Sequence, residues 1–199
     1  DAGVQANGFI CTIGGAPPFP AERLPFALNR ALPADIAVCA ARAAEEGFHP
    51  RYCAVGKEYV YQIWNSRARN PFLAQTAWHY PFPLDAAAAD LAARQLCGRQ
   101  DFRSFMAAGS KITDTVRTVA SAAVMREGEL LRFTVTADGF LYHMVRIMAG
   151  TVCLLASGKA ARPIPEIIAA RDRAAAGPTA PAKGLFLNRV FYPSAAYNF

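Results

Sequence analysis

The sequence predicts an α+β domain in which helices pack against an antiparallel sheet. Segments with the alternation of strands are interspersed with alanine-rich segments that suit helices. Two strand-like segments, 115–125 and 130–137, are separated only by the polar residues 126–129, which predicts a hairpin. Around this hairpin the order is helix, hairpin, helix, strand, which is typical of the α+β class. The sequence has neither repeated strand–helix units nor a glycine-rich phosphate loop, so a doubly wound fold is not expected.

Composition supports a folded protein with a sizeable core. The chain has 199 residues, of which 53% are hydrophobic and 18% charged, and this balance excludes a disordered chain. Its length suits one large domain or two small ones. The net charge of +6 is compatible with a polyanionic partner, although a modest excess of this kind is weak support by itself.

The first quarter of the chain contains few strong structural signals. A proline-rich loop occupies part of 15–32 and leads into a short helix that has Pro20 near its start. Residues 36–41 have strand character because β-branched and small apolar residues dominate there.

A second, clearer strand is predicted at 55–64. Odd-numbered residues from Tyr59 to Ile63 should share one face, and even-numbered residues from Val60 to Trp64 the other.

After the proline-rich boundary at 81–83, the elements follow one another closely. A helix at 85–96 is closed by Gly98, and the hairpin comes next. The remaining elements are a long helix opened by Asp138 and Gly139 and ending near Gly158, a helix at about 164–175 and a last strand at 184–192.

Several classes of protein are excluded by what the sequence lacks. The five cysteines and three histidines are widely spaced, so neither a disulfide scaffold nor a zinc ribbon is expected, and we predict no metal site. Scattered cysteines of this kind are typical of a reducing compartment. The most apolar stretch, 140–156, is too short to span a membrane and is interrupted by His143 and Arg146. We therefore expect no association with a membrane.

An arginine within an apolar helix is the first candidate functional feature. On a continuous helix, Tyr142, Arg146 and Gly150 would share one face, while Phe140, Met144 and Ile147 would line a buried stripe. A buried arginine needs an anionic partner, which a carboxylate from elsewhere in the fold would supply. The alternative is an arginine whose head reaches solvent.

Basic residues alternate with aromatic ones in two neighbouring segments, Phe-His-Pro-Arg from Phe48 and Lys-Glu-Tyr-Val-Tyr from Lys57. This combination suits contacts with phosphates and stacked bases of RNA. On pattern alone, cross-strand packing of Tyr59 and Tyr61 is the better explanation of the second segment.

Six or more segments, in order along nearly the whole chain, resemble the motifs of the TruA family of tRNA pseudouridine synthases. The segments are Asp-Ala-Gly-Val from Asp1, Phe-His-Pro-Arg from Phe48, Tyr-Val-Tyr from Tyr59, Asp-Phe-Arg-Ser-Phe from Asp101, Arg-Thr-Val from Arg117, Gly-Phe-Leu-Tyr-His-Met-Val-Arg from Gly139 and Gly-Leu-Phe-Leu from Gly184. One short motif would be weak evidence for a family, whereas this ordered set of motifs is strong evidence.

The resemblance implies the pseudouridine synthase fold: two ferredoxin-like half-domains with antiparallel sheets, helices on one face and a cleft between them. Residues 1–81 would be the remainder of an N-terminal half-domain and 82–199 the C-terminal half-domain. The family has a further segment before its catalytic aspartate, so we expect the N-terminal half to be incomplete in this chain.

The resemblance also implies roles for individual residues. Asp1 takes the position of the catalytic aspartate, Tyr59 that of the tyrosine that stacks on the target uracil and is assigned proton transfer at C5, and Arg146 that of the arginine that pairs with the catalytic carboxylate. The further residues expected to bind the substrate are Arg51, Lys57, Tyr61, Arg117 and His143.

The implied reaction is the isomerisation of uridine to pseudouridine at positions 38–40 of the anticodon stem-loop of tRNA. The reaction gains and loses no electrons, so no cofactor is expected. The carboxylate could act as a nucleophile at C1′ or as a base at C2′ of the ribose. Family members are homodimers, and a cytoplasmic location is expected.

Two alternatives stay open at this point. The first is a catalytically inactive RNA-binding relative or fragment, because the family histidine that follows Asp-Ala-Gly-Val is Gln5 here. The second is an unrelated α+β interaction domain in which Arg146 pairs with a structural carboxylate.

Overall fold

A computed structural model describes residues 2–15, 18–160 and 162–193. Its centre is a seven-stranded sheet in the order β1-β7-β2-β6-β5-β4, with β3 paired to β2 beside this path. The strands are β1 (Gln5–Ala6), β2 (Gly56–Trp64), β3 (Trp78–His79), β4 (Gly98–Asp101), β5 (Val116–Glu127), β6 (Leu130–Ala137) and β7 (Leu185–Phe191). The helices are α1 (Leu24–Asn29), α2 (Ala86–Arg94), α3 (Met144–Ala156) and α4 (Ile164–Ala170).

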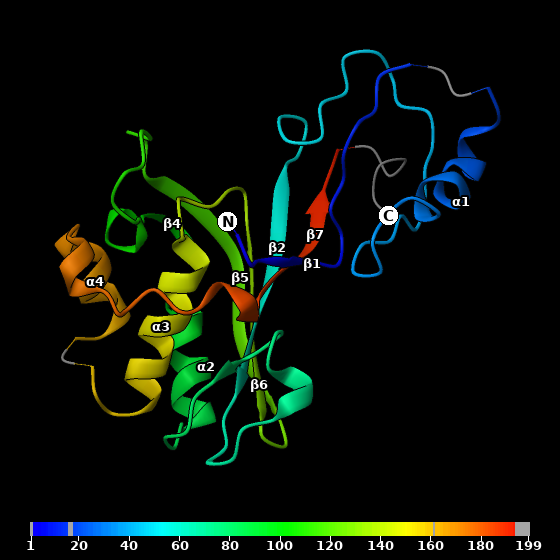
Figure 1. Cartoon of the computed structure of the whole chain (residues 1–199). Coiled ribbons are helices and arrows are strands. Elements are labelled where there is room, and N and C mark those ends of the chain that lie inside the picture. The colour runs from blue at the N-terminus through cyan, green and yellow to red at the C-terminus, as the bar shows by residue number, and fades with distance from the viewer. Residues whose placement is uncertain (1, 16–17, 161, 194–199) are drawn as a thin grey trace. The chain divides into compact units, whose positions relative to one another are not determined.

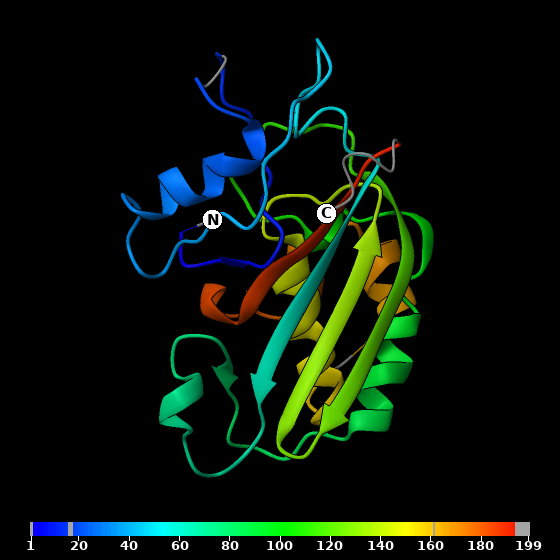
Figure 2. The ribbon, with the colours of Figure 1, turned by 90° about the vertical axis from the view of Figure 1, so that its right-hand side faces the viewer.

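The chain divides into two compact units. One holds the residues up to Phe9 together with 55–191, and thus the whole sheet with α2, α3 and α4. The other holds residues 10–54 and those from Tyr192 onward, including α1. Within the first unit, α2 and α3 lie on the same face of the sheet (Figures 1 and 2).

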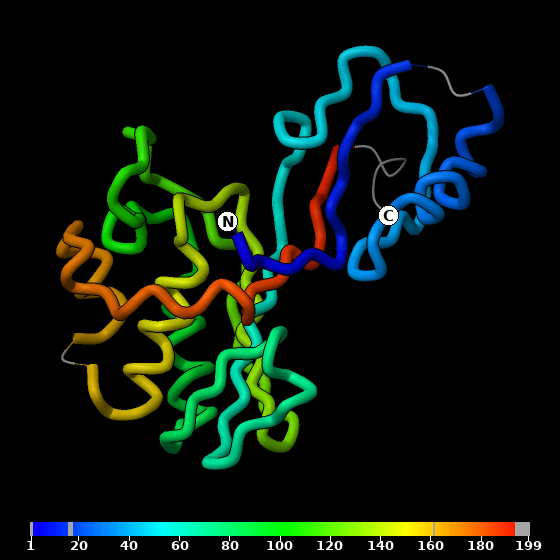
Figure 3. Tube along the Cα trace, in the orientation of Figure 1, coloured from blue at the N-terminus to red at the C-terminus, as the bar shows by residue number. Residues whose placement is uncertain are grey.

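The sheet is mixed rather than purely antiparallel. The central pairings of β2 with β6 and β7, and of β5 with β4 and β6, are antiparallel as predicted. The pairings of β1 with β7 and of β2 with β3 are parallel. In Figure 3, β1 (blue) and β7 (red) run side by side although they are far apart in the sequence.

The predicted strands at 55–64, 115–125, 130–137 and 184–192 are confirmed as β2, β5, β6 and β7. Alternation on β2 also holds, because Tyr61 and Ile63 are buried and Tyr59 is half-buried on the same face. The hairpin turn has two residues, not four, because β5 continues to Glu127; Gly128 supplies the positive φ of 60° that such a turn requires.

The helix predicted at 85–96 is confirmed as α2. The Asp85 side chain accepts hydrogen bonds from the backbone N–H groups of Ala87 and Ala88, at 2.9 and 3.1 Å, and so caps the helix. Ala89, Ala92 and Ala93 pack into the core.

Three predicted elements differ from the structure. The long helix begins at Met144 rather than near Asp138, because His143 adopts a left-handed conformation (φ 57°) directly before it. The helix at 164–175 ends at Ala170, since Arg171 is also left-handed (φ 50°), and a separate 3₁₀ turn follows. Residues 36–41 form no strand.

The segment predicted as a strand at 36–41 is held by a side chain instead of a sheet. The Asn29 amide donates to the Val38 carbonyl oxygen at 3.0 Å and accepts from the Val38 N–H at 2.7 Å. This pair of bonds satisfies the backbone of Val38 without a neighbouring strand.

A tight crossing between α3 and the segment 176–180 depends on glycine. A β-carbon at Gly150 would lie 1.9 Å from the carbonyl oxygen of Pro178, and one at Gly177 would lie 2.7 Å from the Cα of Thr151. Thr151 reinforces the crossing because its hydroxyl accepts from the N–H of Gly177 at 2.9 Å. The segment is thereby fixed across the helix.

The predicted domain boundary at 81/82 falls between β3 and α2, and the sheet continues through it. β2, from the predicted first half, lies between β7 and β6, which both belong to the predicted second half. The contact-based units divide the chain elsewhere, at residues 9–10, 54–55 and 191–192. The two-half-domain organisation therefore stays a prediction.

α2 covers the part of β5 that β4 leaves open. β4 pairs with β5 only over residues 116–119. Beyond them, the Asp90 carboxylate accepts from the Val124 N–H at 2.9 Å and from Arg94 Nε at 2.8 Å. These two bonds lower the pKa of the Asp90 carboxyl, and the bond from Val124 has the larger effect. The carboxylate thus occupies a strand edge that could otherwise pair with another chain.

We expect Asp90→Asn to reduce the pH dependence of stability. Because the folded-state pKa is lowered, the ionised carboxylate stabilises the fold above about pH 4, and this contribution is lost as the pH falls through the lowered pKa. Asparagine still accepts from Val124, so the unfolding free energy at neutral pH should fall by only about 1 kcal/mol. Urea unfolding followed by circular dichroism measures the difference in unfolding free energy between the unsubstituted protein and Asp90→Asn. This difference should shrink toward acidic pH. A difference that stays constant down to about pH 3 would contradict a role for the charge.

Candidate active site

Three of the predicted site residues, Tyr59, Arg117 and His143, lie at the loop 138–143, which joins β6 to α3. Asp138 fixes the start of this loop: its N–H donates to the Thr118 carbonyl oxygen at 3.1 Å, and its carboxylate accepts from the Thr118 N–H at 3.0 Å. Beside it, the side chain of Arg117 covers Gly139, with Nε 3.4 Å from where a β-carbon would stand. Arg117 therefore lies at this loop, and its role in substrate binding stays a prediction.

Tyr59 lies against the same loop through an aromatic contact. Its ring meets that of Phe140 edge to face, with ring centroids 5.1 Å apart and an interplanar angle of 87°. Such contacts fix the orientation of both rings. Burial raises the pKa of the Tyr59 phenol, so the hydroxyl keeps its proton at neutral pH.

His143 ends the loop and begins α3. Its imidazole stacks on the ring of Tyr142, with centroids 3.9 Å apart, and its carbonyl oxygen accepts from the Ile147 N–H at 3.0 Å. Burial, and then the positive charge of Arg146, lower the pKa of His143. The imidazole is therefore held in its neutral form at neutral pH.

Arg146, in the first turn of α3, is tied to one residue by two hydrogen bonds. Its Nε donates to the Ala180 carbonyl oxygen at 2.7 Å, and the Ala180 N–H donates back to the Arg146 carbonyl oxygen at 3.1 Å. Tyr142 precedes the helix, so the expected continuous helix through Tyr142, Arg146 and Gly150 does not form, and only Arg146 and Gly150 lie one turn apart on α3. Arg146 is oriented by backbone, and an arginine held through Nε presents its terminal nitrogens together toward one side.

The segment 180–184, here called the strap, also receives Tyr61. The Tyr61 hydroxyl donates to the Pro181 carbonyl oxygen at 2.7 Å, and its ring lies 2.9 Å from where a β-carbon of Gly184 would stand. The Tyr61 side chain is 0% exposed, and burial raises the pKa of its phenol. Tyr61 is fully buried beneath the strap, and its predicted role in substrate binding stays a prediction.

The residues that follow Asp1 approach the strap as well. A β-carbon at Gly3 would lie 3.5 Å from that of Ala182, and Val4 packs against the core. Gln5 pairs with Phe186 and its amide donates to the Gln75 carbonyl oxygen at 3.4 Å. Asp1 itself lies outside the described residues. The strap is thus the common neighbour of Arg146, Tyr61 and the start of the chain.

Two further residues, Lys57 and Arg51, were predicted to bind the substrate. Lys57 is half-buried on β2, between Ala137 and Val190, and alternation puts it on the Tyr59 face. Arg51 is exposed in the other compact unit, with its guanidinium carbon 5.8 Å from the ring centroid of Tyr52. The substrate-binding roles of both residues stay predictions.

The strap carbonyls are the site groups that sequence reasoning missed. They act through the backbone, so no side chain marks them. The available signal is the run Gly-Pro-Thr-Ala-Pro-Ala-Lys-Gly from Gly177, in which glycine and proline at both ends favour an irregular segment.

In the described part of the chain, no three His, Cys, Asp or Glu side chains are arranged to hold a metal ion. The five cysteines are free thiols. No helix among the described residues is long and apolar enough to cross a membrane.

Comparison with known proteins identifies the class of protein to which these elements belong. A family model described as tRNA pseudouridine synthase matches residues 92–193, which include β4 to β7, the loop 138–143, α3 and the strap. The chain is thus placed among pseudouridine synthases by the elements that carry Arg117, His143 and Arg146.

Individual relatives narrow the assignment. The chain is 48% identical over 193 residues to tRNA pseudouridine synthase A of Moorella thermoacetica, which covers 96% of this chain and 78% of that protein. It is 44% identical over 190 residues to the enzyme of that name from Halalkalibacterium halodurans, covering 95% and 72%, and 40% identical over 193 residues to that of Bacillus subtilis, covering 96% and 78%. The chain belongs to the tRNA pseudouridine synthase A family, an isomerase family, and is not an unrelated interaction domain.

We expect Tyr61→Phe to destabilise the fold by about 1–2 kcal/mol, because the Pro181 carbonyl oxygen loses a buried donor that water cannot replace. Urea unfolding measures this loss. Tyr142→Phe is the matched control: Tyr142 is 44% exposed, so removal of its hydroxyl should leave stability nearly unchanged. Equal stabilities of the two variants would contradict the proposed importance of the strap bond.

Proposed function

We propose that this chain isomerises uridine to pseudouridine in tRNA, at positions 38–40 of the anticodon stem-loop. Family membership supplies the reaction. The observation that supports it for these residues is the contact of Tyr59 with Phe140, which lies in the loop that leads into the helix carrying Arg146. The target base has to leave its stack to be reached, and a fixed aromatic ring suits a flipped uracil.

Asp1 is proposed as the catalytic carboxylate. Support comes from the residues after it, since Gly3 lies next to Ala182 in the strap that orients Arg146. An arginine beside a carboxylate favours its ionised form even where water is excluded. The ionised form is needed both for attack at C1′ and for proton abstraction at C2′.

Tyr59 is proposed to stack on the uracil and to serve in proton transfer at C5. Phe140 holds the Tyr59 ring by its edge, which leaves the ring orientation fixed while the detached base turns. The raised pKa keeps the phenol protonated, so it can donate a hydrogen bond and exchange a proton only when a base assists.

The reaction balances without a cofactor. The N1–C1′ bond breaks, the uracil rotates, the C5–C1′ bond forms, and the proton lost from C5 is matched by one gained at N1. The other cations proposed to contact RNA are Arg51, Lys57 and Arg117, with neutral His143 as a hydrogen-bonding group. Phosphate contacts of this kind make RNA binding sensitive to salt.

The organisation proposed for the enzyme is that of its family: half-domains at 1–81 and 82–199, and a homodimer in which the RNA lies across both subunits. Continuity of the sheet through β2 supports close coupling of the two halves.

Asp1→Asn should abolish pseudouridine formation and leave tRNA binding within about two-fold, because the substitution removes the charge but little volume. Tritium release from tRNA that carries tritium at C5 of uridine measures turnover, and equilibrium binding of the same tRNA is the control. Full activity of the variant would overturn the assignment of Asp1. An inactive unsubstituted protein that binds tRNA would instead favour the inactive RNA-binding relative.

Tyr59→Phe should lower kcat by about 100-fold or more while KM changes little, because the ring and its contact with Phe140 remain and only the hydroxyl is lost. Single-turnover tritium release separates this effect from binding. If Tyr59 acts only by stacking, the variant keeps most of its activity, and the proton-transfer role is wrong.

A further inference from the structure

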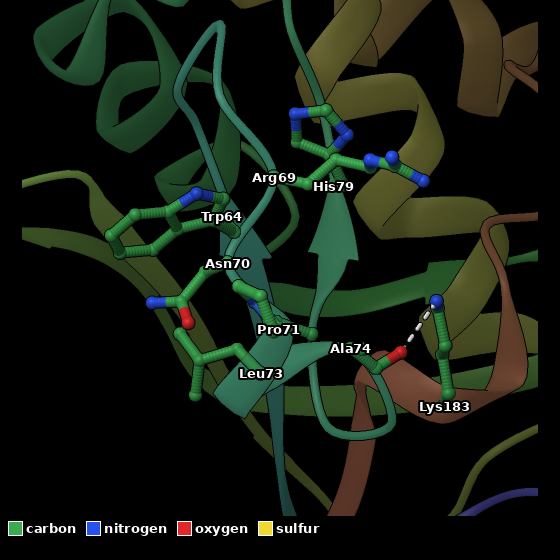
Figure 4. Close-up of a pocket in the computed structure, with 9 residues that line it drawn as sticks. Trp64, Arg69, Asn70, Pro71, Leu73, Ala74, His79 and Lys183 are labelled. Atoms are coloured by element: carbon green, nitrogen blue, oxygen red, sulfur yellow. Dashed lines mark hydrogen bonds between the residues drawn. The ribbon is translucent and has the colours of Figure 1, made fainter.

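A second pocket, separate from the candidate active site, lies beside the end of β2. Its volume is about 700 Å³, within the range of small-molecule sites. Residues that line it include Trp64, Arg69, Asn70, Leu73, His79 and Lys183 (Figure 4). None of them belongs to the residues assigned above to the reaction.

The pocket walls are held by hydrogen bonds from the lining side chains to the loop 65–77. Trp64 Nε1 donates to the Ala68 carbonyl oxygen at 2.9 Å, which fixes the plane of the indole. His79 Nε2 lies 2.8 Å from the Ser66 carbonyl oxygen. Lys183 Nζ donates to the Ala74 carbonyl oxygen at 2.7 Å, and a dashed line marks this bond in Figure 4. The pocket is therefore preorganised.

The chemistry of the lining favours an anionic, aromatic ligand. Arg69 and Lys183 contribute positive charge, and the lining contains no aspartate or glutamate. Asn70 caps the 3₁₀ turn Pro71–Leu73 by accepting from the Phe72 N–H at 3.0 Å, and the indole of Trp64 offers an aromatic surface. Cations beside a fixed aromatic ring are the combination with which proteins hold a phosphodiester and its base.

We propose that this pocket is a second RNA subsite, which takes one nucleotide of the tRNA outside the base that is isomerised. Arg69 and Lys183 hold its phosphate, and Trp64 contacts its base. The inference rests on the proposed function, because it takes tRNA as the substrate. Lys183 belongs to the strap that orients Arg146, so one short segment serves both the subsite and the candidate active site.

The test compares Arg69→Ala and Lys183→Met with Arg67→Ala. Arg67 is an exposed arginine of the same loop that does not line the pocket, so it controls for general electrostatic attraction. We expect each pocket variant to weaken tRNA binding about 5- to 20-fold and to reduce the slope of log affinity against log salt by about one. Arg67→Ala should weaken binding by about two-fold or less.

Turnover and fluorescence complete the experiment. At saturating tRNA, kcat of Arg69→Ala should stay within about two-fold of the unsubstituted protein, since a subsite that only binds changes KM. Binding of tRNA should quench the fluorescence of Trp64. This quenching should be lost in Trp64→Phe, which retains only Trp78 of the two tryptophans. Thermal unfolding checks that each variant is folded.

The outcomes separate the subsite from the proposed function. Equal effects of Arg67→Ala and Arg69→Ala, or unchanged binding in both pocket variants, would overturn the subsite even if the protein is active. Absence of pseudouridine formation by the unsubstituted protein would overturn the proposed function, whereas selective loss of tRNA binding in the pocket variants would still support the subsite.

Discussion

The reciprocal hydrogen bonds between Arg146 and Ala180 are the interaction on which the arrangement of the site depends. They join the first turn of α3 to a segment without regular structure, and that segment in turn receives Tyr61 and lies beside Gly3. The glycine-dependent crossing at Gly150 keeps the two backbones close enough for these bonds. A cation at the surface of a core helix is thus oriented by carbonyl groups, which are far less mobile than side chains.

Burial favours the uncharged form of each of the three titratable groups near this interaction. It raises the pKa of the phenols of Tyr59 and Tyr61 and lowers that of His143, so all three are neutral at pH 7. Arg146 keeps its charge because arginine cannot be deprotonated under ordinary conditions. The described part of the site therefore carries a net positive charge. This charge favours binding of a carboxylate or a phosphate and disfavours a second cation.

Much of the sheet could be predicted because local patterns determine it. Alternation predicted β2 and the hairpin, and Asp85 predicted the start of α2. The start of α3 could not be predicted, since the apolar run from Gly139 gives no sign that His143 is left-handed. The strap and the second pocket also escaped prediction. The first acts through backbone oxygens, and the second joins Trp64 and Arg69 to Lys183, which is distant in sequence.

β7 lies between β1 and β2 although it follows every other described strand in the sequence. The gap that it fills stays open until residues 185–191 have been synthesised. Until then, residues 56–61 of β2 have no partner on the edge that β7 occupies, and the strap cannot close over Tyr61 and Arg146. Long-range pairing of this kind forms slowly and leaves unpaired edges exposed in the meantime. A nascent chain is thus unable to assemble the candidate site before residues 185–191 have left the ribosome.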